Sequence, residues 1–230
     1  MFRSSRFFAC SSLLCLALLS AAVPRLRADT AELVLSSQPG DFIGAGQTKD
    51  IIYTPSNSNF FSASVSDVIA GLPSYLSFAM GTVTSSNATN TFSTLAFATN
   101  QLGIAFQPGV YGLPGNTAQR APFASPGHAG LDVTFQNRGS NTLTGNFTVS
   151  SVQFFKDTSN NFQLGELDVT FEQHSEGARP ALFGHFTYLA TGFNLPTVPD
   201  NGGSMLLLGL GVAALFVVSR RIGAAAYQKR

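Results

Sequence analysis

The sequence predicts an all-β fold, an antiparallel β-sandwich of the jelly-roll type, over residues 29–196. Two observations predict it. The stretch is rich in Ser, Thr, Asn, Gly and Phe, and its apolar residues almost never recur at the spacing of a helix. Short runs of β-favouring residues are instead separated by turn residues, which is typical of sandwiches and barrels. A closed barrel stays an alternative. About 168 residues are enough to bury one core without disulfides.

Nine segments are expected to be strands, namely 50–54, 60–65, 75–80, 91–98, 131–136, 143–149, 152–156, 164–172 and 182–188. Leu131, Val133 and Phe135 alternate with polar residues, so these three side chains should face the core. Only Ser66 to Leu72 hints at a helical turn, which Gly71 and Pro73 would end.

The C-terminal half contains an internal echo. The sequence Leu-Asp-Val-Thr-Phe at 131–135 returns at 167–171, and Leu-Thr-Gly-Asn-Phe-Thr at 143–148 returns as Leu-Phe-Gly-His-Phe-Thr at 182–187. Two units are too few for a solenoid. We therefore expect paired hairpins within one sandwich, each with a glycine at a bulge or a close contact.

Residues 1–28 are predicted to be a secretory signal peptide. Arg3 and Arg6 precede an apolar run over 7–19, and small residues follow it. Cleavage after Ala22 or after Ala28 fits the pattern equally well. An N-terminal membrane anchor is disfavoured because the apolar run has only 13 residues. Both cysteines, Cys10 and Cys15, lie in this segment, so the mature protein has none.

Residues 205–219 are predicted to form one transmembrane helix. With its small flanking residues, the run from Gly202 to Ser219 is 18 residues long. At ~1.5 Å per residue this is about 27 Å, slightly less than the ~30 Å hydrocarbon core. A buried core helix is the alternative, but the run has no polar face. Arg220 and Arg221 follow it, which indicates that residues 220–230 are a basic cytoplasmic tail and that the β-domain lies outside.

The end of the chain resembles the PEP-CTERM family of bacterial sorting signals, in the variant whose motif begins Val-Pro-Asp. Residues 197–204 contain that motif, and an apolar helix and an arginine pair follow in order. The resemblance implies recognition and processing by an exosortase, a membrane protease and transpeptidase. The implied recognition residues are Val198, Pro199, Asp200, Gly202, Gly203, Arg220 and Arg221.

The β-domain resembles an uncharacterised secreted bacterial β-domain. The similar segments are Gln38 to Thr48, Arg138 to Gly145 and Phe171 to Gly177. The resemblance implies that a pair of cysteines is replaced here by Ser140 and Ser175, and that these two residues lie close together.

Charge excludes one class of partner. Residues 29–204 hold five basic residues against twelve acidic ones, a net charge of −7. Nucleic-acid binding needs the opposite balance, because the phosphate backbone dominates affinity. We expect no nucleic-acid partner.

Catalytic motifs are scarce. The mature chain has no cysteine nucleophile, no Gly-x-Ser-x-Gly elbow and no phosphate loop. The best metal-like grouping is His174 with Glu172 and Glu176, and with His185 across a loop. Its spacing fits no common metal site, and we expect His174 to order the loop by hydrogen bonds instead. No metal or cofactor is expected.

Three carboxylates are candidate site residues. Asp132 and Asp168 occupy equivalent places in the repeated strands, where paired carboxylates could hydrolyse a glycan. Both fall in the outward register, which favours a solvated strand face. Asp41 lies in a Pro-Gly-Asp-Phe turn, where an Asx-type turn is favoured over a calcium ligand.

Aromatic residues are mostly phenylalanine, with 21 Phe against five Tyr and no Trp. Such a set of aromatic residues indicates core packing before sugar binding, because sugar-binding faces favour Tyr and Trp. One residue of each pair Phe60-Phe61 and Phe154-Phe155 is expected to be exposed, because neighbours on a strand point to opposite faces.

The sequence therefore predicts a non-enzymatic, exported protein of the cell surface or extracellular matrix, held in the membrane by its C-terminal helix before sorting. Its expected partners are an exosortase-type membrane protease and the membrane, with extracellular polysaccharide as a further candidate. A carbohydrate-binding module or weak glycan hydrolase at the cell surface is the alternative.

Overall fold

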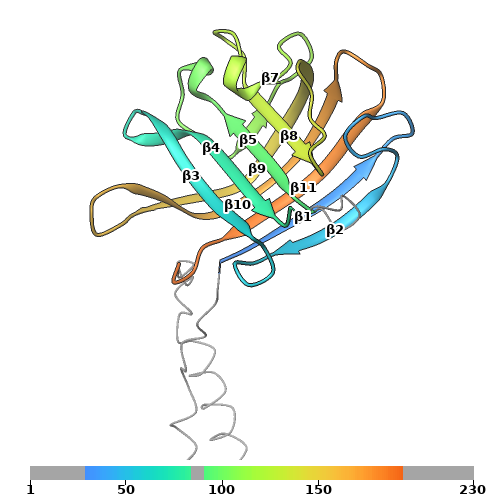
Figure 1. The fold of residues 1–230 in the computed structure, drawn as a ribbon. Coiled ribbons are helices and arrows are strands. Elements are labelled where there is room, and N and C mark those ends of the chain that lie inside the picture. The colour runs from blue at the N-terminus through green and yellow to red at the C-terminus, as the bar shows by residue number, and fades with distance from the viewer. Residues whose placement is uncertain (1–28, 84–90, 194–230) are drawn as a thin grey trace, which may run out of the picture. The chain divides into compact units, whose positions relative to one another are not determined.

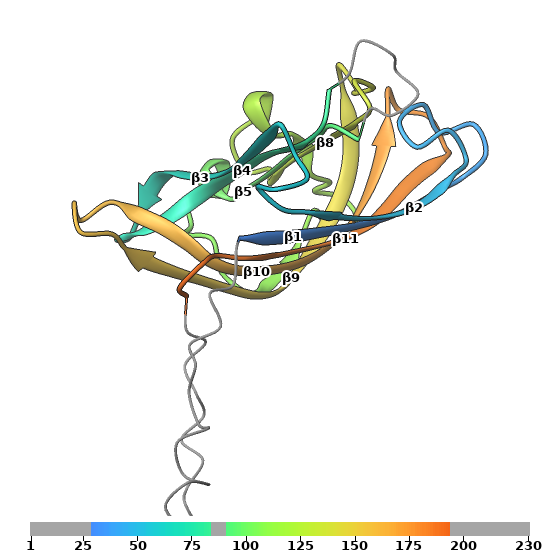
Figure 2. The ribbon, with the colours of Figure 1, turned by 60° about the horizontal axis from the view of Figure 1, so that its bottom comes forward.

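The computed structural model describes residues 29–83 and 91–193, and these fold into two β-sheets with only two short 3-10 turns (Figure 1). Figure 2 shows the sheets as two layers. The all-β prediction is confirmed. Within the described part no helix is long and apolar enough to cross a membrane. The predicted leader, sorting motif, transmembrane helix and cytoplasmic tail lie outside the described residues.

Sheet A has six strands in the order β2 (Thr48–Tyr53), β1 (Thr30–Ser37), β11 (Ala181–Leu189), β10 (Phe162–Ser175), β9 (Leu143–Lys156) and β6 (Gly109–Tyr111). Sheet B has five strands in the order β3 (Phe60–Ile69), β4 (Leu72–Gly81), β5 (Ser93–Ala98), β8 (Gly130–Phe135) and β7 (Gln119–Arg120). The 3-10 turns are η2 (Asn100–Leu102) and η3 (Ala121–Phe123). Each pair of neighbouring strands is antiparallel except β7 and β8, which are parallel.

The core lies between the sheets and is rich in phenylalanine. Alternate residues of each strand point inward, so Leu131, Val133 and Phe135 are buried as the alternation predicts. Rings from the two sheets meet there: Phe97 of β5 packs edge-on against Phe147 of β9, with 5.4 Å between ring centroids.

Two short polar links also join the sheets. Gln173 of β10 is fully buried, and its side-chain amide donates to the carbonyl of Val133 and accepts from its N–H, at 3.1 and 2.9 Å. On the other side of the core, the hydroxyl of Tyr53 of β2 donates to the carbonyl of Thr91 and bonds Ser93.

The predicted helical turn over 66–72 is wrong. β3 continues to Ile69, which pairs with Leu72, and a two-residue hairpin turn joins them. Ala70 and Gly71 both have positive φ, of 52° and 83°, as a tight I′-type turn requires. The apparent helical spacing comes from a strand end followed by a turn.

Strand boundaries also differ from the prediction. β1 was not anticipated, and neither were the short β6 and β7. The two segments expected at 143–149 and 152–156 form the single strand β9, which bends where its register with β10 shifts near Ser150 and near Gly165. A bulge in a continuous strand gives the same sequence signal as a break between two strands.

The internal echo does not form two equivalent hairpins. The first Leu-Asp-Val-Thr-Phe lies in β8 of sheet B, whereas the second lies in β10 of sheet A. Of the two echoed strand pairs, β10 and β11 form a hairpin, whereas β8 and β9 lie in different sheets. The two echoed glycines do mark close contacts, because a Cβ on Gly184 would overlap the ring of Phe171 and one on Gly145 would overlap the backbone of Glu172.

Candidate functional site

The outer face of sheet B is covered by small side chains. Two cross-strand rows of paired residues define it, Ser64–Ser77–Ala96–Asp132 and Ser62–Ala79–Thr94–Thr134. We call these eight residues the small-residue face. Because serine, alanine and threonine project so little from a sheet, the backbone of β3, β4, β5 and β8 lies close to the surface here.

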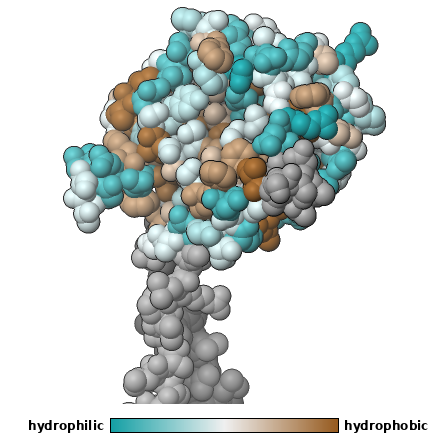
Figure 3. Space-filling view, viewed as in Figure 1, coloured by the Kyte–Doolittle hydropathy of each residue, from teal (hydrophilic) through white to brown (hydrophobic). Residues whose placement is uncertain are grey.

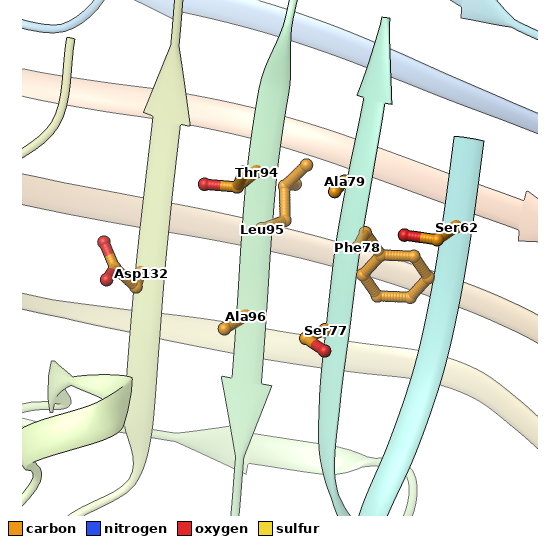
Figure 4. Close-up of a pocket in the computed structure, with 8 residues that line it drawn as sticks. All are labelled: Ser62, Ser77, Phe78, Ala79, Thr94, Leu95, Ala96 and Asp132. Atoms are coloured by element: carbon orange, nitrogen blue, oxygen red, sulfur yellow. The ribbon is translucent and has the colours of Figure 1, made fainter. Parts of the chain in front are cut away.

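A shallow hollow of about 240 Å³ lies on this face (Figure 4). Its lining includes the hydroxyls of Ser62, Ser77 and Thr94 and the methyl groups of Ala79 and Ala96. Thr94 and Thr134 share a 2.5 Å hydrogen bond across β5 and β8, which fixes their hydroxyls. The hollow therefore offers polar groups over an apolar floor, with no bulky side chain in the way.

Asp132 is the carboxylate of this face. Figure 4 shows it turned away from Ala96 on the neighbouring strand. Its Oδ2 accepts from Nε of Arg120 at 3.0 Å, and its Oδ1 is buried without a partner among the described residues. Burial raises the pKa of Asp132, and the hydrogen bond and charge of Arg120 oppose this rise.

Arg120 links this face to a second hollow, of about 230 Å³, beside the loop over 138–142. Its guanidinium lies over the ring of Phe123, 5.4 Å from the centroid, and its Nη1 donates to the carbonyl of Asn141 at 3.4 Å. Phe123 itself is 71% exposed. Asp132 thus anchors a guanidinium that lies over an exposed aromatic ring, beside Thr142 and Thr144.

The outer face of sheet A is acidic instead. Its outward positions carry Glu32, Asp50, Glu166, Asp168 and Glu172, together with His174 and His185. Nε2 of His185 bonds Asp168 at 3.1 Å, and Nε2 of His174 bonds Glu172 at 2.9 Å. These side chains are engaged with their neighbours on the sheet and with solvent, as on an ordinary hydrated face.

Asp132 and Asp168 do not form the carboxylate pair that the disfavoured glycan-hydrolase alternative would need. Asp132 points outward from sheet B and Asp168 outward from sheet A, so the core separates them. The repeat gave both the same local register, but register does not determine which sheet a strand joins. These two carboxylates cannot act together on a glycosidic bond.

His174 behaves as expected. Its Nδ1 bonds the carbonyl of Arg179 at 3.0 Å, and this contact ties together the turn between β10 and β11. Glu176 instead accepts from the backbone N–H groups of Asn141 and Thr142, which lowers the pKa of its carboxyl. In the part of the chain that the structure describes, no three His, Cys, Asp or Glu side chains gather closely enough to hold a metal ion.

Asp41 forms the predicted side-chain turn. Its Oδ2 accepts from the N–H of Gly44 and from the hydroxyl of Ser37, both at 2.7 Å. The residue is buried, and its Oδ1 has no partner among the described groups. The side chain stabilises the loop between β1 and β2 in the manner of an Asx turn.

Ser140 and Ser175 are both buried, and both hydroxyls lack a hydrogen-bond partner within the described residues. The segments around them meet, because the N–H of Glu176 donates to the carbonyl of Thr142 and Ser175 is opposite Leu143 in the β9–β10 register. Two unsatisfied hydroxyls in such places are unfavourable, and small apolar or sulfur-containing side chains would suit them better. Their implied origin as a cysteine pair remains a prediction.

The phenylalanine pairs divide as expected. Phe60 is 51% exposed and Phe61 packs partly against the core; Phe155 is the more exposed of its pair. Sequence reasoning missed Arg120, Phe123 and the small-residue face. The alternating serines 62, 64 and 66 were the available signal, since hydroxyls at every second position mark one face of a strand. The predicted sorting residues, 198–203 with 220 and 221, lie outside the described residues.

Comparisons of the chain with protein-family models, with curated proteins and with solved structures found no match.

Proposed function

We propose that the protein is a non-enzymatic, exported component of the bacterial cell surface or extracellular matrix. In this proposal a jelly-roll-like β-sandwich is delivered by the leader over 1–28, held by a transmembrane helix over 205–219, and sorted through the Val-Pro-Asp motif by an exosortase-type protease. The observation that carries it is the order of motif, apolar run and arginine pair at the end of the chain.

The arrangement of the domain's own ends supports this proposal. Thr30 at the start of β1 is opposite Leu189 at the end of β11. Asp29 accepts hydrogen bonds from the N–H of Thr191 and the hydroxyl of Tyr188. The chain therefore enters the described domain beside the point where it leaves it. Removal of a leader and tethering through a tail would then leave the loops at the other end of the strands free.

The test is the intact mass of the protein recovered from envelope and medium of its native host, with peptide mapping of its C-terminus. Sorting predicts a chain that ends between Asp200 and Ser204, or that carries added mass there. A full-length chain ending at Arg230 in the membrane fraction would contradict sorting, and would make the protein a permanent single-span anchor.

Carbohydrate binding is the second candidate, and the small-residue face favours it. Shallow hollows with hydroxyls over an apolar floor suit a polysaccharide, whose hydroxyls need partners and whose ring faces need flat apolar contact. The exposed ring of Phe123, which lines the second hollow, supplies an aromatic surface. We place this candidate on sheet B, because its outer face carries the hollow of about 240 Å³ and the second hollow lies beside Arg120 and Phe123.

A matched pair of variants tests the second candidate. Phe123 lies under Arg120, and Phe42, which is 53% exposed, lies in the same way under Arg138 with 4.7 Å to its ring centroid. Phe123→Ala should weaken binding to the host's extracellular polysaccharide at least ten-fold, whereas Phe42→Ala should leave it unchanged. Equal loss in both variants, or no binding across a broad glycan panel, would exclude this candidate without affecting the sorting proposal.

A further inference from the structure

β3 is an edge strand of unusual length and composition. It forms ten residues of one edge of sheet B and pairs only with β4. Every residue of β3 is at least partly exposed. Along its outer edge, between Phe60 and Ser66, the described residues provide no backbone hydrogen-bond partner. This edge is therefore a template for one more strand.

The other edges of the two sheets are protected. β2 has six residues and carries Lys49 and Asp50, and charged side chains are the usual defence of an edge. β6 has only three residues and β7 only two. By contrast, the segment 60–66 has no charged residue, no proline and no bulge. Figure 3, which has the view of Figure 1, shows apolar side chains on the side where β3 lies. Phe60 and Val68 are over half exposed.

We propose that β3 pairs in antiparallel fashion with β3 of a second copy of the chain, which would join two five-stranded sheets into one of ten strands. The sequence is self-complementary in the register centred on Ala63. In that register Phe61 is opposite Val65 and Ser62 is opposite Ser64, so apolar side chains meet on the inner face and hydroxyls on the outer face.

The neighbouring register, centred on Ser64, has a less favourable pairing, and this favours the register centred on Ala63. Centring the pair on Ser64 would place Phe61 opposite Asp67, an acidic residue whose φ of 53° departs from strand geometry. In the register centred on Ala63, Asp67 is opposite Asn59, outside the seven-residue ladder. The backbone of β3 thus sets where the pairing ends.

Charge favours a second copy at this edge over any other part of the surface. The described residues carry five basic and eleven acidic side chains, so two copies repel each other. Five of the acids lie on the outer face of sheet A, away from β3. The acid of the small-residue face, Asp132, is paired with Arg120. Asp67 is the one acid of β3 and lies beyond the segment 60–66, so approach through this segment brings together uncharged parts of two acidic domains.

Cysteine cross-linking tests the register. The full chain with Cys10→Ser and Cys15→Ser has no thiol, so one added cysteine reports one position. Ala63→Cys lies on the two-fold axis and should form a disulfide dimer under mild oxidation, because directly opposed Cβ atoms are ~4.5–5.5 Å apart. Ser77→Cys, on the neighbouring strand of the same sheet, is the control and should stay monomeric. Equal cross-linking at both positions would overturn the register.

Sedimentation of the full chain and its variants, all in the same detergent, tests whether two copies associate. Ser64→Lys places two like charges beside the axis and should weaken the dimer at least ten-fold. Thr170→Lys adds the same charge to the outer face of sheet A and should leave the dimer unchanged. Both variants should keep the parent's unfolding temperature, since both positions are exposed. A parent chain that stays monomeric at millimolar concentration, or a strand of another protein bound to β3 in its place, would overturn the proposal.

Discussion

The outer faces of the two sheets differ in chemistry although the sheets share one core. Sheet A presents five carboxylates and two histidines, whereas the small-residue face of sheet B presents serine, threonine and alanine around one carboxylate, Asp132, which is paired with Arg120. A charged face stays hydrated, because partners must displace its water and its counterions. A face of small hydroxyls and methyl groups has less bound water and fewer counterions to displace when a partner contacts it. This difference supports our proposals that place the contacts of the domain on sheet B.

The largest expected effect on stability concerns Ser140, in the segment that connects β8 of sheet B to β9 of sheet A. We predict that Ser140→Cys with Ser175→Cys forms a disulfide, closes a loop of about 36 residues and raises the free energy of unfolding by up to about 4 kcal/mol. Chemical denaturation under oxidising and reducing conditions measures this gain. The reduced double variant serves as the control. A double variant that stays fully reduced under mild oxidation would show that the two residues are not close.

The next effect concerns the amide that joins the sheets. Gln173→Leu should lower the free energy of unfolding by about 3 kcal/mol, because it leaves the N–H and the carbonyl of Val133 buried without partners. Gln163→Leu, at a partly exposed position of the same strand, is the matched control and should cost under about 1 kcal/mol. Equal losses would mean that the amide of Gln173 adds nothing special to the joint.

Tyr53 provides a pH test of the same joint. Burial raises its pKa to about 12, against 10 in the unfolded chain, and the bond with Ser93 offsets this only in part. The folded state therefore holds the phenol neutral, so its contribution is complete below pH 10 and is lost as the pH rises toward 12. The loss should reach about 2–3 kcal/mol.

Tyr53→Phe should flatten the alkaline limb of the stability curve. Part of the limb should remain, because burial and Asp29 also raise the pKa of Tyr188. Urea titrations between pH 8 and 12 measure both curves. If the variant were as sensitive to alkali as the parent, Tyr53 would not carry the effect.

The smallest effect on stability compares the faces directly. Ala79→Glu on sheet B and Thr170→Glu on sheet A should each change the free energy of unfolding by under about 0.5 kcal/mol, because both positions face outward. Their effects on polysaccharide binding should differ, with loss only for Ala79→Glu, because Ala79 lines the hollow on the small-residue face. Loss in both variants would indicate that net charge matters and that the choice of face does not.

Much of the core was predictable because alternation is a local property. The residues of β8 and the exposed members of the phenylalanine pairs follow directly from the period of two. No local pattern predicts the burial of Ser140 and Ser175, and the resemblance implies only that these two residues lie close together.

Other features depend on the partner strand, which no local pattern encodes. Asp132 and Asp168 share one motif and one register, yet they point from opposite faces of the molecule. The hairpin turn at Ala70 was missed because it required a positive φ at an alanine, which is uncommon outside glycine and asparagine. The small-residue face was missed because serine and alanine carry little signal alone, and the face exists only once four strands align.

In our proposals, sheet B makes the contacts of the domain, through its outer face and the edge strand β3. Hydrogen–deuterium exchange of the full chain tests this claim most directly, measured when dilute, when concentrated and with the host's extracellular polymer. We predict added protection over 60–66 on concentration and over 72–81 and 93–98 with polymer, and none over 181–189. Protection confined to 162–189, on the acidic side, would contradict the claim.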